Sequence, residues 1–346
     1  MKIMVRGGLT AGLLAAGVLF ILAACGSSRS SDFGDGSGDD GGSSGALGFG
    51  SSGGSSGGDA HACQGLECQV QSCGGGSETS ITGTAFAPNG TLPLYDVVVY
   101  VPNSKPDDLV QGVTCDQCGA VTGNPVTTAL SDATGKFVLH NAPVGDNIPL
   151  VLQVGKWRRQ VTIPHVAACT ENALTDHELT RLPKNQTEGN MPHIALTSGG
   201  CDLLGCVLPK IGIDASEFGK DGDGYAKAVH VYTGGGGGTG SMPDATTLWN
   251  DVNKLKTYDM AILSCECSEN LGNKGGASGP AFDAITQYMN AGGRIFTSDY
   301  MYSWYRYTKD NGLKSAVNLR GGAPPGGDPM TIDTTFAKGK ALGDWL

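Results

Sequence analysis

Short alternating apolar segments dominate the chain between residues 78 and 182. Residues 95–101, YDVVVYV, are β-branched and aromatic, and residues 136–140, KFVLH, follow the turn DATG as the expected hairpin partner of residues 126–130. Strands at this spacing, with no helical period between them, predict a β-sandwich. The predicted strands are 80–87, 95–101, 126–130, 136–140, 148–154 and 158–163.

From residue 192 the pattern changes to apolar strands that alternate with helical segments. Residues 203–211 carry apolar side chains at helical spacing until Pro209 kinks or ends the helix. Residues 244–255 and 280–290 predict two more helices. Such alternation predicts a parallel sheet with right-handed crossovers. The predicted strands are 193–197, 228–232, 259–264 and 294–298.

The first 25 residues carry the pattern of an export signal. Lys2 and Arg6 precede an uncharged run over residues 9–24, which is shorter than the ~20 residues of a spanning helix. The run ends in LAAC, which resembles a bacterial lipobox, where small residues permit cleavage and the thiol receives a diacylglycerol. We expect residues 1–24 to be a lipoprotein signal peptide and Cys25 to be lipidated. A transmembrane anchor, or an ordinary cysteine behind an ordinary signal, is the weaker alternative.

Residues 25–60 predict a disordered tether. Glycine and serine make up 24 of the 35 residues 26–60, a composition that cannot bury enough apolar surface to fold. Several acyl chains on one residue give durable attachment to a bilayer. Gly26, rather than aspartate, follows Cys25, and in lipoproteins of double-membraned bacteria this favours the outer membrane. We therefore expect the outer-membrane bilayer as a partner, on its periplasmic or surface face.

The chain has 346 residues, enough for two domains beyond the signal and the tether. We expect a Cys-rich segment at 61–77, an all-β domain at 78–182, a linker at 183–191 and an α/β domain at 192–346. The net charge is −10, and no basic run exceeds residues 157–159, so a nucleic-acid partner is not expected.

Eleven cysteines are present, and ten remain when Cys25 is set aside, an even number that predicts disulfides in an exported chain. The CxxC at residues 115–118 lies in a loop-like stretch, where a local disulfide is favoured over a redox motif or a zinc site. No cofactor and no metal are expected. The pairing stays open. The candidates are a small stapled knot (Cys63, Cys68, Cys73), the CxxC pair (Cys115, Cys118), Cys169, and two bridges near one sheet edge (Cys201, Cys206, Cys265, Cys267).

Ligands of open parallel sheets lie beyond the C-terminal ends of the strands. Cys265, Glu266 and Asp299 occupy such ends and are weak catalytic candidates. Cys265 lacks both the flanking glycines of a nucleophile elbow and a partner histidine. The glycine run 234–238 lacks the Lys-Ser/Thr of a phosphate-binding loop, which favours a flexible insertion.

Four segments of the first domain resemble the carboxypeptidase regulatory-like family. They are ITGTAF at 81–86, VVVYV at 97–101, LSDATGKFVL at 130–139 and APVG at 142–145. The resemblance implies an accessory β-sandwich module that is not itself a peptidase.

Two segments of the second domain resemble the flavodoxin-like, class I glutamine amidotransferase-like superfamily. They are YDMAIL at 258–263 and AGGRIF at 291–296. Members usually have five or more strands, and four are predicted here, while residues 337–346 read as a helix at the end of the chain. Either the domain is truncated or its edge pairs elsewhere.

The order of lipobox, tether, β module and α/β domain resembles bacterial surface lipoproteins with a carboxypeptidase regulatory-like domain, a resemblance that implies no reaction. The favoured hypothesis is a membrane-anchored binding or structural protein, not an enzyme, with a glycan or a protein as ligand. The alternative is an anchored amidotransferase-like or hydrolase-like enzyme that acts on envelope glycans or amides.

Overall fold

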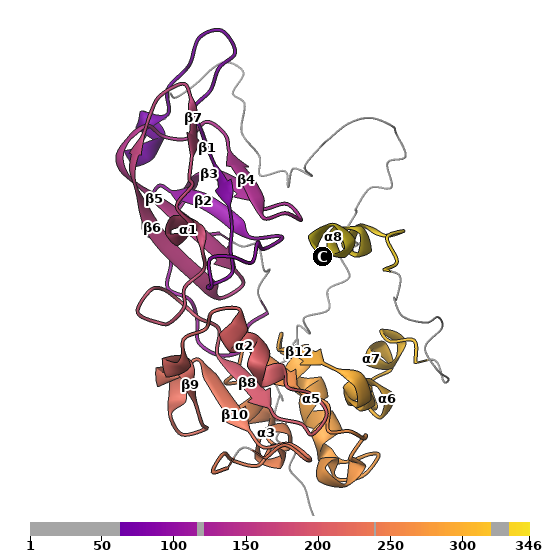
Figure 1. The fold of residues 1–346 in the computed structure, drawn as a ribbon. Coiled ribbons are helices and arrows are strands. Elements are labelled where there is room, and N and C mark those ends of the chain that lie inside the picture. The colour runs from indigo at the N-terminus through magenta and orange to yellow at the C-terminus, as the bar shows by residue number, and fades with distance from the viewer. Residues whose placement is uncertain (1–62, 116–120, 239, 320–331) are drawn as a thin grey trace, which may run out of the picture.

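The computed structural model describes residues 63–115, 121–238, 240–319 and 332–346. The predicted signal peptide, the tether, Cys25 and Cys118 lie outside these residues. The described residues form a β domain and an α/β domain, which lie one above the other in Figure 1. The predicted fold class, an all-β domain followed by a parallel α/β domain, is confirmed. No helix in the described ranges has the length and apolarity needed to cross a bilayer.

The β domain consists of two packed sheets, with strand orders β4-β1-β7 and β3-β2-β5-β6. Alternate side chains of both sheets meet in a core that includes Ile81, Val99, Phe137 and Leu150, all of them buried. The strands are β1 (Ser80–Thr84), β2 (Val98–Pro102), β3 (Pro125–Leu130), β4 (Lys136–Leu139), β5 (Gly145–Val154), β6 (Trp157–Val166) and β7 (Glu171–Ala173). Two short helices, η1 (Gly65–Gln69) and α1 (His177–Thr180), flank them.

The expected hairpin between residues 126–130 and 136–140 is wrong. β3 pairs with β2 and β4 pairs with β1, so the turn between them carries the chain from one sheet to the other. Ser131 stabilises this crossing, because its hydroxyl accepts from the Val97 amide and donates to the Leu94 carbonyl. Asp132 then accepts from the Thr134 and Lys136 amides and closes the turn.

The α/β domain has a five-stranded parallel sheet of order β12-β11-β8-β10-β9. Its strands are β8 (Ile194–Thr197), β9 (Phe218–Gly219), β10 (Val229–Tyr232), β11 (Met260–Leu263) and β12 (Arg294–Thr297). Its α-helices are α2 (Val207–Lys210), α3 (Thr246–Trp249), α4 (Val252–Leu255), α5 (Pro280–Asn290), α6 (Ser303–Arg306) and α7 (Asn311–Ser315). The short helices are η2 (Leu204–Cys206), η3 (Ala215–Glu217), η4 (Gly224–Ala226), η5 (Leu271–Lys274) and η6 (Asp299–Tyr302).

Two features of this domain differ from the prediction. The two-residue strand β9 is too short to give a periodic signal, and it makes the fifth strand. The single helix expected at 244–255 is divided into α3 and α4. Asp251 causes the break, because its carboxylate accepts from the Asn253 and Lys254 amides and starts a new helix.

The helices cover the two faces of the parallel sheet unequally. Leu208 of α2 packs with Ile194 and Val229 on one face. α3, α4 and α5 pack on the other face, where Trp249 and Phe282 are buried. The chain thus leaves β8 toward one face and leaves β10 and β11 toward the other, so the topological switch point lies beside β8.

The N-terminal edge of the parallel sheet faces the β domain. Lys156 forms a largely buried salt bridge of 2.7 Å with Asp259, the residue before β11. The Val113 amide donates to the Lys256 carbonyl, and the Asn89 amide donates to the Ile211 carbonyl. The C-terminal edge of the sheet, with the switch point, is therefore on the side away from the β domain.

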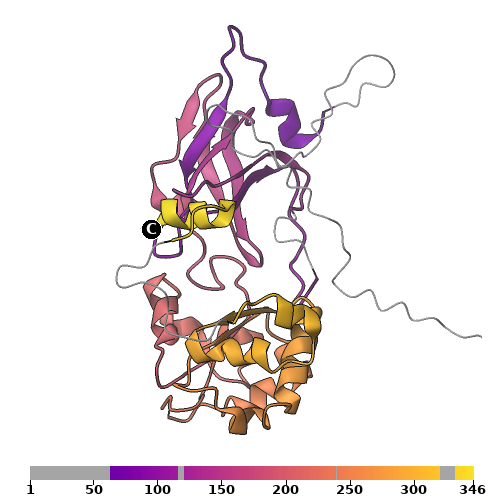
Figure 2. The same ribbon diagram turned by 90° about the vertical axis from the view of Figure 1, so that its right-hand side faces the viewer.

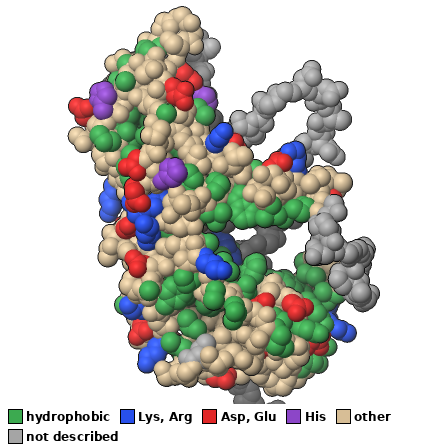
Figure 3. All heavy atoms as spheres, in the orientation of Figure 1, with side chains coloured by type: hydrophobic (Ala, Val, Ile, Leu, Met, Phe, Trp, Pro, Cys, Tyr) green, Lys and Arg blue, Asp and Glu red, His purple; other side chains and the backbone are tan. Residues whose placement is uncertain are grey.

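The predicted C-terminal helix is present as α8 (Ala337–Trp345). It lies beside the β domain in both ribbon views (Figures 1 and 2), and the Trp345 indole donates to the Pro93 carbonyl at 2.9 Å. Lys338 lies 4.8 Å from the centroid of the Tyr95 ring. Hydrophobic side chains gather along this helix in the space-filling view (Figure 3). α8 thus joins the β domain rather than extending the parallel sheet.

Candidate functional site

A cavity of about 370 Å³ lies at the C-terminal edge of the parallel sheet, beside β8. We call it the edge cavity. It opens between the loop that follows β8 and the glycine-rich loop that follows β10. Besides glycines, the residues that line it are Leu196, Ser198, Asp202, Leu203, Cys206, Phe218 and Val231. The cavity lies at the topological switch point, where open parallel sheets bind ligands, and its volume is within the range of small-molecule pockets.

Glycines allow the loops around the edge cavity to approach closely. A Cβ atom on Gly199 would lie 2.1 Å from the Cys265 carbonyl oxygen. A Cβ atom on Gly234 would lie 2.1 Å from the Ser198 carbonyl oxygen. Both separations are far below van der Waals contact, so larger residues at these positions would push the loops after β8, β10 and β11 apart.

The glycine-rich loop is held by hydrogen bonds at its start, unlike the flexible insertion that the sequence favours. The Gly234 amide donates to the Ser198 hydroxyl at 3.3 Å, and the Gly235 amide donates to Glu266 at 2.6 Å. The Gly237 amide donates to the Gly234 carbonyl, and the Gly200 amide donates to the Gly235 carbonyl. These amides donate to oxygen atoms of the protein and are not directed at a phosphate.

Glu266 belongs to a buried ion pair. Its carboxylate lies 2.8 Å from Lys274 Nζ, and the two side chains are 1% and 0% exposed. Lys274 also donates to the Glu269 carbonyl, and its Nζ lies 5.2 and 5.3 Å from the ring centroids of Trp249 and Trp304. Burial lowers the pKa of Lys274, against the opposing effect of Glu266. Glu266 therefore supports the glycine-rich loop and is not placed as a catalytic acid.

Cys265 and Asp299 do come together, as their positions at strand ends suggested. The Cys265 thiol is a free thiol, is fully buried, and donates to Asp299 Oδ2 at 3.4 Å. Burial raises the pKa of the Cys265 thiol, and the Asp299 carboxylate raises it further, so the thiol stays protonated at neutral pH.

The backbone at this position is not that of a nucleophile elbow. In such an elbow the nucleophile itself occupies the strained turn. Among residues 264–268, the residue with a positive φ is Cys267, at 65°. Cys267 is disulfide-bonded to Cys201. The strained residue is therefore a disulfide cysteine and not the free thiol.

Each histidine in the described ranges is engaged away from Cys265. His193 Nδ1 contacts the Thr257 carbonyl and His230 Nδ1 contacts the Tyr258 hydroxyl. Burial lowers the pKa of both rings. Of the other three, His140 contacts Glu78, His165 contacts Asp146, and His177 contacts the Gly90 carbonyl. Within the described residues the thiol thus has no imidazole base.

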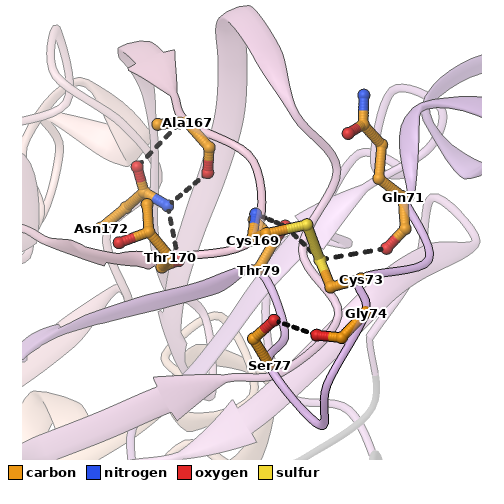
Figure 4. The surroundings of a disulfide bond; sticks show 9 residues. All are labelled: Gln71, Cys73, Gly74, Ser77, Thr79, Ala167, Cys169, Thr170 and Asn172. Atoms are coloured by element: carbon orange, nitrogen blue, oxygen red, sulfur yellow. Dashed lines mark hydrogen bonds between the residues drawn. A yellow bond between two sulfur atoms is a disulfide. The ribbon is translucent and has the colours of Figure 1, made fainter.

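The structure pairs several of the candidate cysteines. The bonds are Cys63–Cys68, Cys73–Cys169 and Cys201–Cys267, and Cys115 is disulfide-bonded as well. Figure 4 shows the bond from Cys73 to Cys169. Instead of a knot within residues 63–73, this bond spans the β domain. Of the two bridges expected near the sheet edge, one forms, between Cys201 and Cys267. Cys265 and Cys206 are free thiols, the first buried and the second exposed. In the described ranges no cluster of three or more acidic, histidine or cysteine side chains is placed to hold a metal.

Sequence reasoning missed Lys274 and Asp202. Lys274 lies in a glycine-rich turn with no periodic signal around it. Asp202 accepts from the Cys265 amide at 3.1 Å and from the Ser298 hydroxyl, and it lines the edge cavity. Its position five residues after the end of the strand predicted at 193–197 is the signal that the sequence offers.

No protein-family model matches the chain, and no curated protein is significantly similar to it. Among solved structures, the chain is similar to an N-terminal interface mutant of a type II cohesin–X-dockerin complex from Acetivibrio cellulolyticus. The sequence identity is 11%, the match covers 39% of this chain and 85% of that chain, and the TM-score is 0.21. A similarity of this size supports no conclusion about function.

Proposed function

We propose that the chain is a lipid-anchored, non-enzymatic binding protein of the bacterial envelope, with the edge cavity as its ligand site. The observation that carries this proposal is a small-molecule-sized cavity whose described lining holds one carboxylate, one hydroxyl and the free thiol of Cys206, but no lysine, arginine or histidine. The lipobox-like sequence before Cys25 supports the anchor, and the Gly/Ser-rich tether would hold the folded domains off the bilayer.

A second candidate function is an anchored amidotransferase-like or hydrolase-like enzyme. The observation in its favour is that Cys265 is a free thiol at a strand end, in contact with Asp299. Against it stand the burial of the thiol and its raised pKa. A cysteine nucleophile reacts as the thiolate, which both effects disfavour.

The anchor is tested by metabolic labelling with an alkyne analogue of palmitate in a bacterial host. The wild-type chain is expected to carry the label and to sediment with membranes. Cys25→Ser should abolish the label and release the protein, because no other residue of the lipobox can accept a diacylglycerol. Cys206→Ser, which removes an exposed free thiol, is the matched control and should remain labelled. A wild-type chain without label in the soluble fraction would refute the anchor.

Thiol accessibility separates the two functions. A reagent that releases a chromophore when it reacts with a thiol is added to the native proteins. The wild type is expected to release one equivalent of chromophore more than Cys206→Ser, because Cys206 is exposed. Cys265→Ala should release the same amount as the wild type until denaturant is added, because the Cys265 thiol is fully buried. Rapid modification of Cys265 in the native protein would instead favour the enzyme.

A further inference from the structure

The edge cavity combines an apolar surface with a single acidic group. Leu196, Leu203, Phe218 and Val231 supply the apolar side chains, and Asp202 supplies the carboxylate. Leu203 is 78% exposed, so folding leaves a large apolar side chain in water at the cavity wall. A ligand with an apolar body would remove this surface from water, at about 25 cal/mol per Å².

The charges around the edge cavity disfavour an anionic ligand. None of the described residues that line it is a lysine, an arginine or a histidine. Both hydrogen bonds to Asp202 within the described chain come from neutral donors, the Cys265 amide and the Ser298 hydroxyl. These donors orient the carboxylate and leave its charge without a counter-ion.

The backbone of the glycine-rich loop offers little to a phosphate or a carboxylate. Glycine loops bind anions through unpaired amides that point at the ligand. Here the amides of Gly234, Gly235 and Gly237 donate to protein oxygens, and so does that of Gly200 on the facing loop. These four amides are therefore occupied by the protein itself.

Building on the proposed binding function, we propose that the edge cavity binds a small amphipathic ligand that carries an ammonium group. The apolar body of the ligand contacts Leu203 and Phe218, and its N–H groups donate to Asp202. A charge-assisted hydrogen bond of this kind is stronger than a neutral one. The cavity volume of about 370 Å³ accommodates a ring with a short amine chain.

Three matched probes test the ligand class by calorimetric titration of the full chain at pH 7. They are 2-phenylethylamine, 2-phenylethanol and phenylacetate, which share the phenyl group and carry a cation, a neutral hydroxyl and an anion. The amine is expected to bind about tenfold more tightly than the alcohol, and phenylacetate to bind most weakly. Equal affinity for amine and phenylacetate, or no binding of the amine, would overturn the proposal.

Asp202→Asn tests the role of the carboxylate. Asparagine keeps an oxygen that can accept from the Cys265 amide and the Ser298 hydroxyl, so the loop is expected to stay in place. The affinity for the amine should fall about tenfold, to that for the alcohol, while the alcohol binds as before. Asp283→Asn removes the same charge on α5, where the carboxylate pairs with Lys309, and should change neither affinity. Unchanged selectivity for the amine in Asp202→Asn would contradict the proposal.

Leu203→Ser tests the apolar contact without a cost to folding, since the side chain is exposed. It should lower the affinity for the amine and for the alcohol by the same factor, and Val207→Ser, an exposed position outside the cavity lining, should lower neither. Labelling of Cys25 is independent of these titrations. If the chain is lipidated but does not select the amine, only the proposed ligand class is refuted. If the chain is unlabelled but selects the amine, only the proposed anchor is refuted.

Discussion

Lys274→Met is expected to lower the free energy of unfolding of the α/β domain by about 3–5 kcal/mol. The substitution leaves Glu266 as a buried charge without a partner, because Lys274 Nζ lies 2.8 Å from its carboxylate and both side chains are almost completely buried. Methionine fills a similar volume between Trp249 and Trp304, so the loss of packing is small. Urea unfolding at pH 7, followed by tryptophan fluorescence, measures the change.

The charge itself is tested by Lys274→Met combined with Glu266→Gln. The neutral amide keeps an oxygen to accept from the Gly235 amide, so the double variant should be more stable than Lys274→Met alone. The direction of the pKa of Lys274 agrees, because burial lowers this pKa against the opposing effect of Glu266. Lys309→Met breaks an exposed pair of 2.7 Å with Asp283 and should cost less than about 1 kcal/mol. Equal losses in Lys274→Met and Lys309→Met would contradict this account.

The sequence predicts the β domain strands and the parallel α/β order because these depend on local periodicity. The strand predicted at 95–101 is observed as the fully buried strand β2 at 98–102, and residues 280–290 form α5 with its predicted bounds. The helix predicted at 244–255 fails at Asp251, where one side chain competes with the helical hydrogen bonds. Local patterns thus give the elements, and single capping residues decide where they break.

The contacts that build the site are not local, and the sequence does not encode them in any spacing. The partner of Glu266 is Lys274 in a turn, and the partner of Cys201 is Cys267, which is 66 residues away. Cys265 stays free because the fold places it in the core beside Asp299. Parallel strands end at one edge of a sheet, and the loop residues 198–200 and 236–238, which follow β8 and β10, line the edge cavity there. The strand-end candidates Cys265, Glu266 and Asp299 are not part of its lining.

Removing the Cys73–Cys169 disulfide, with alanine at both positions, is expected to destabilise the β domain by about 4–5 kcal/mol. The bond joins cysteines 96 residues apart, so the reduced unfolded chain regains the entropy of a long loop. Urea unfolding of the non-reduced variant and the wild type measures the loss. Cys63–Cys68 spans only five residues, and its removal should cost about 2 kcal/mol on the same argument.

The position of the long disulfide also connects stability to the proposed anchor. Cys73 lies between the tether and β1, and the bond fastens this segment to the turn before β7, where the Cys169 amide donates to Thr79 (Figure 4). Without the bond, the segment before β1 would be held to the β domain by hydrogen bonds and packing alone, such as the bond from the Leu66 amide to Asn103 and the bond from the Val144 amide to the Gln69 carbonyl. In limited proteolysis the Cys73/Cys169 alanine variant should be cleaved between residues 69 and 79 faster than the Cys63/Cys68 alanine variant. Equal cleavage of the two variants would show that the sheet holds this segment without the disulfide.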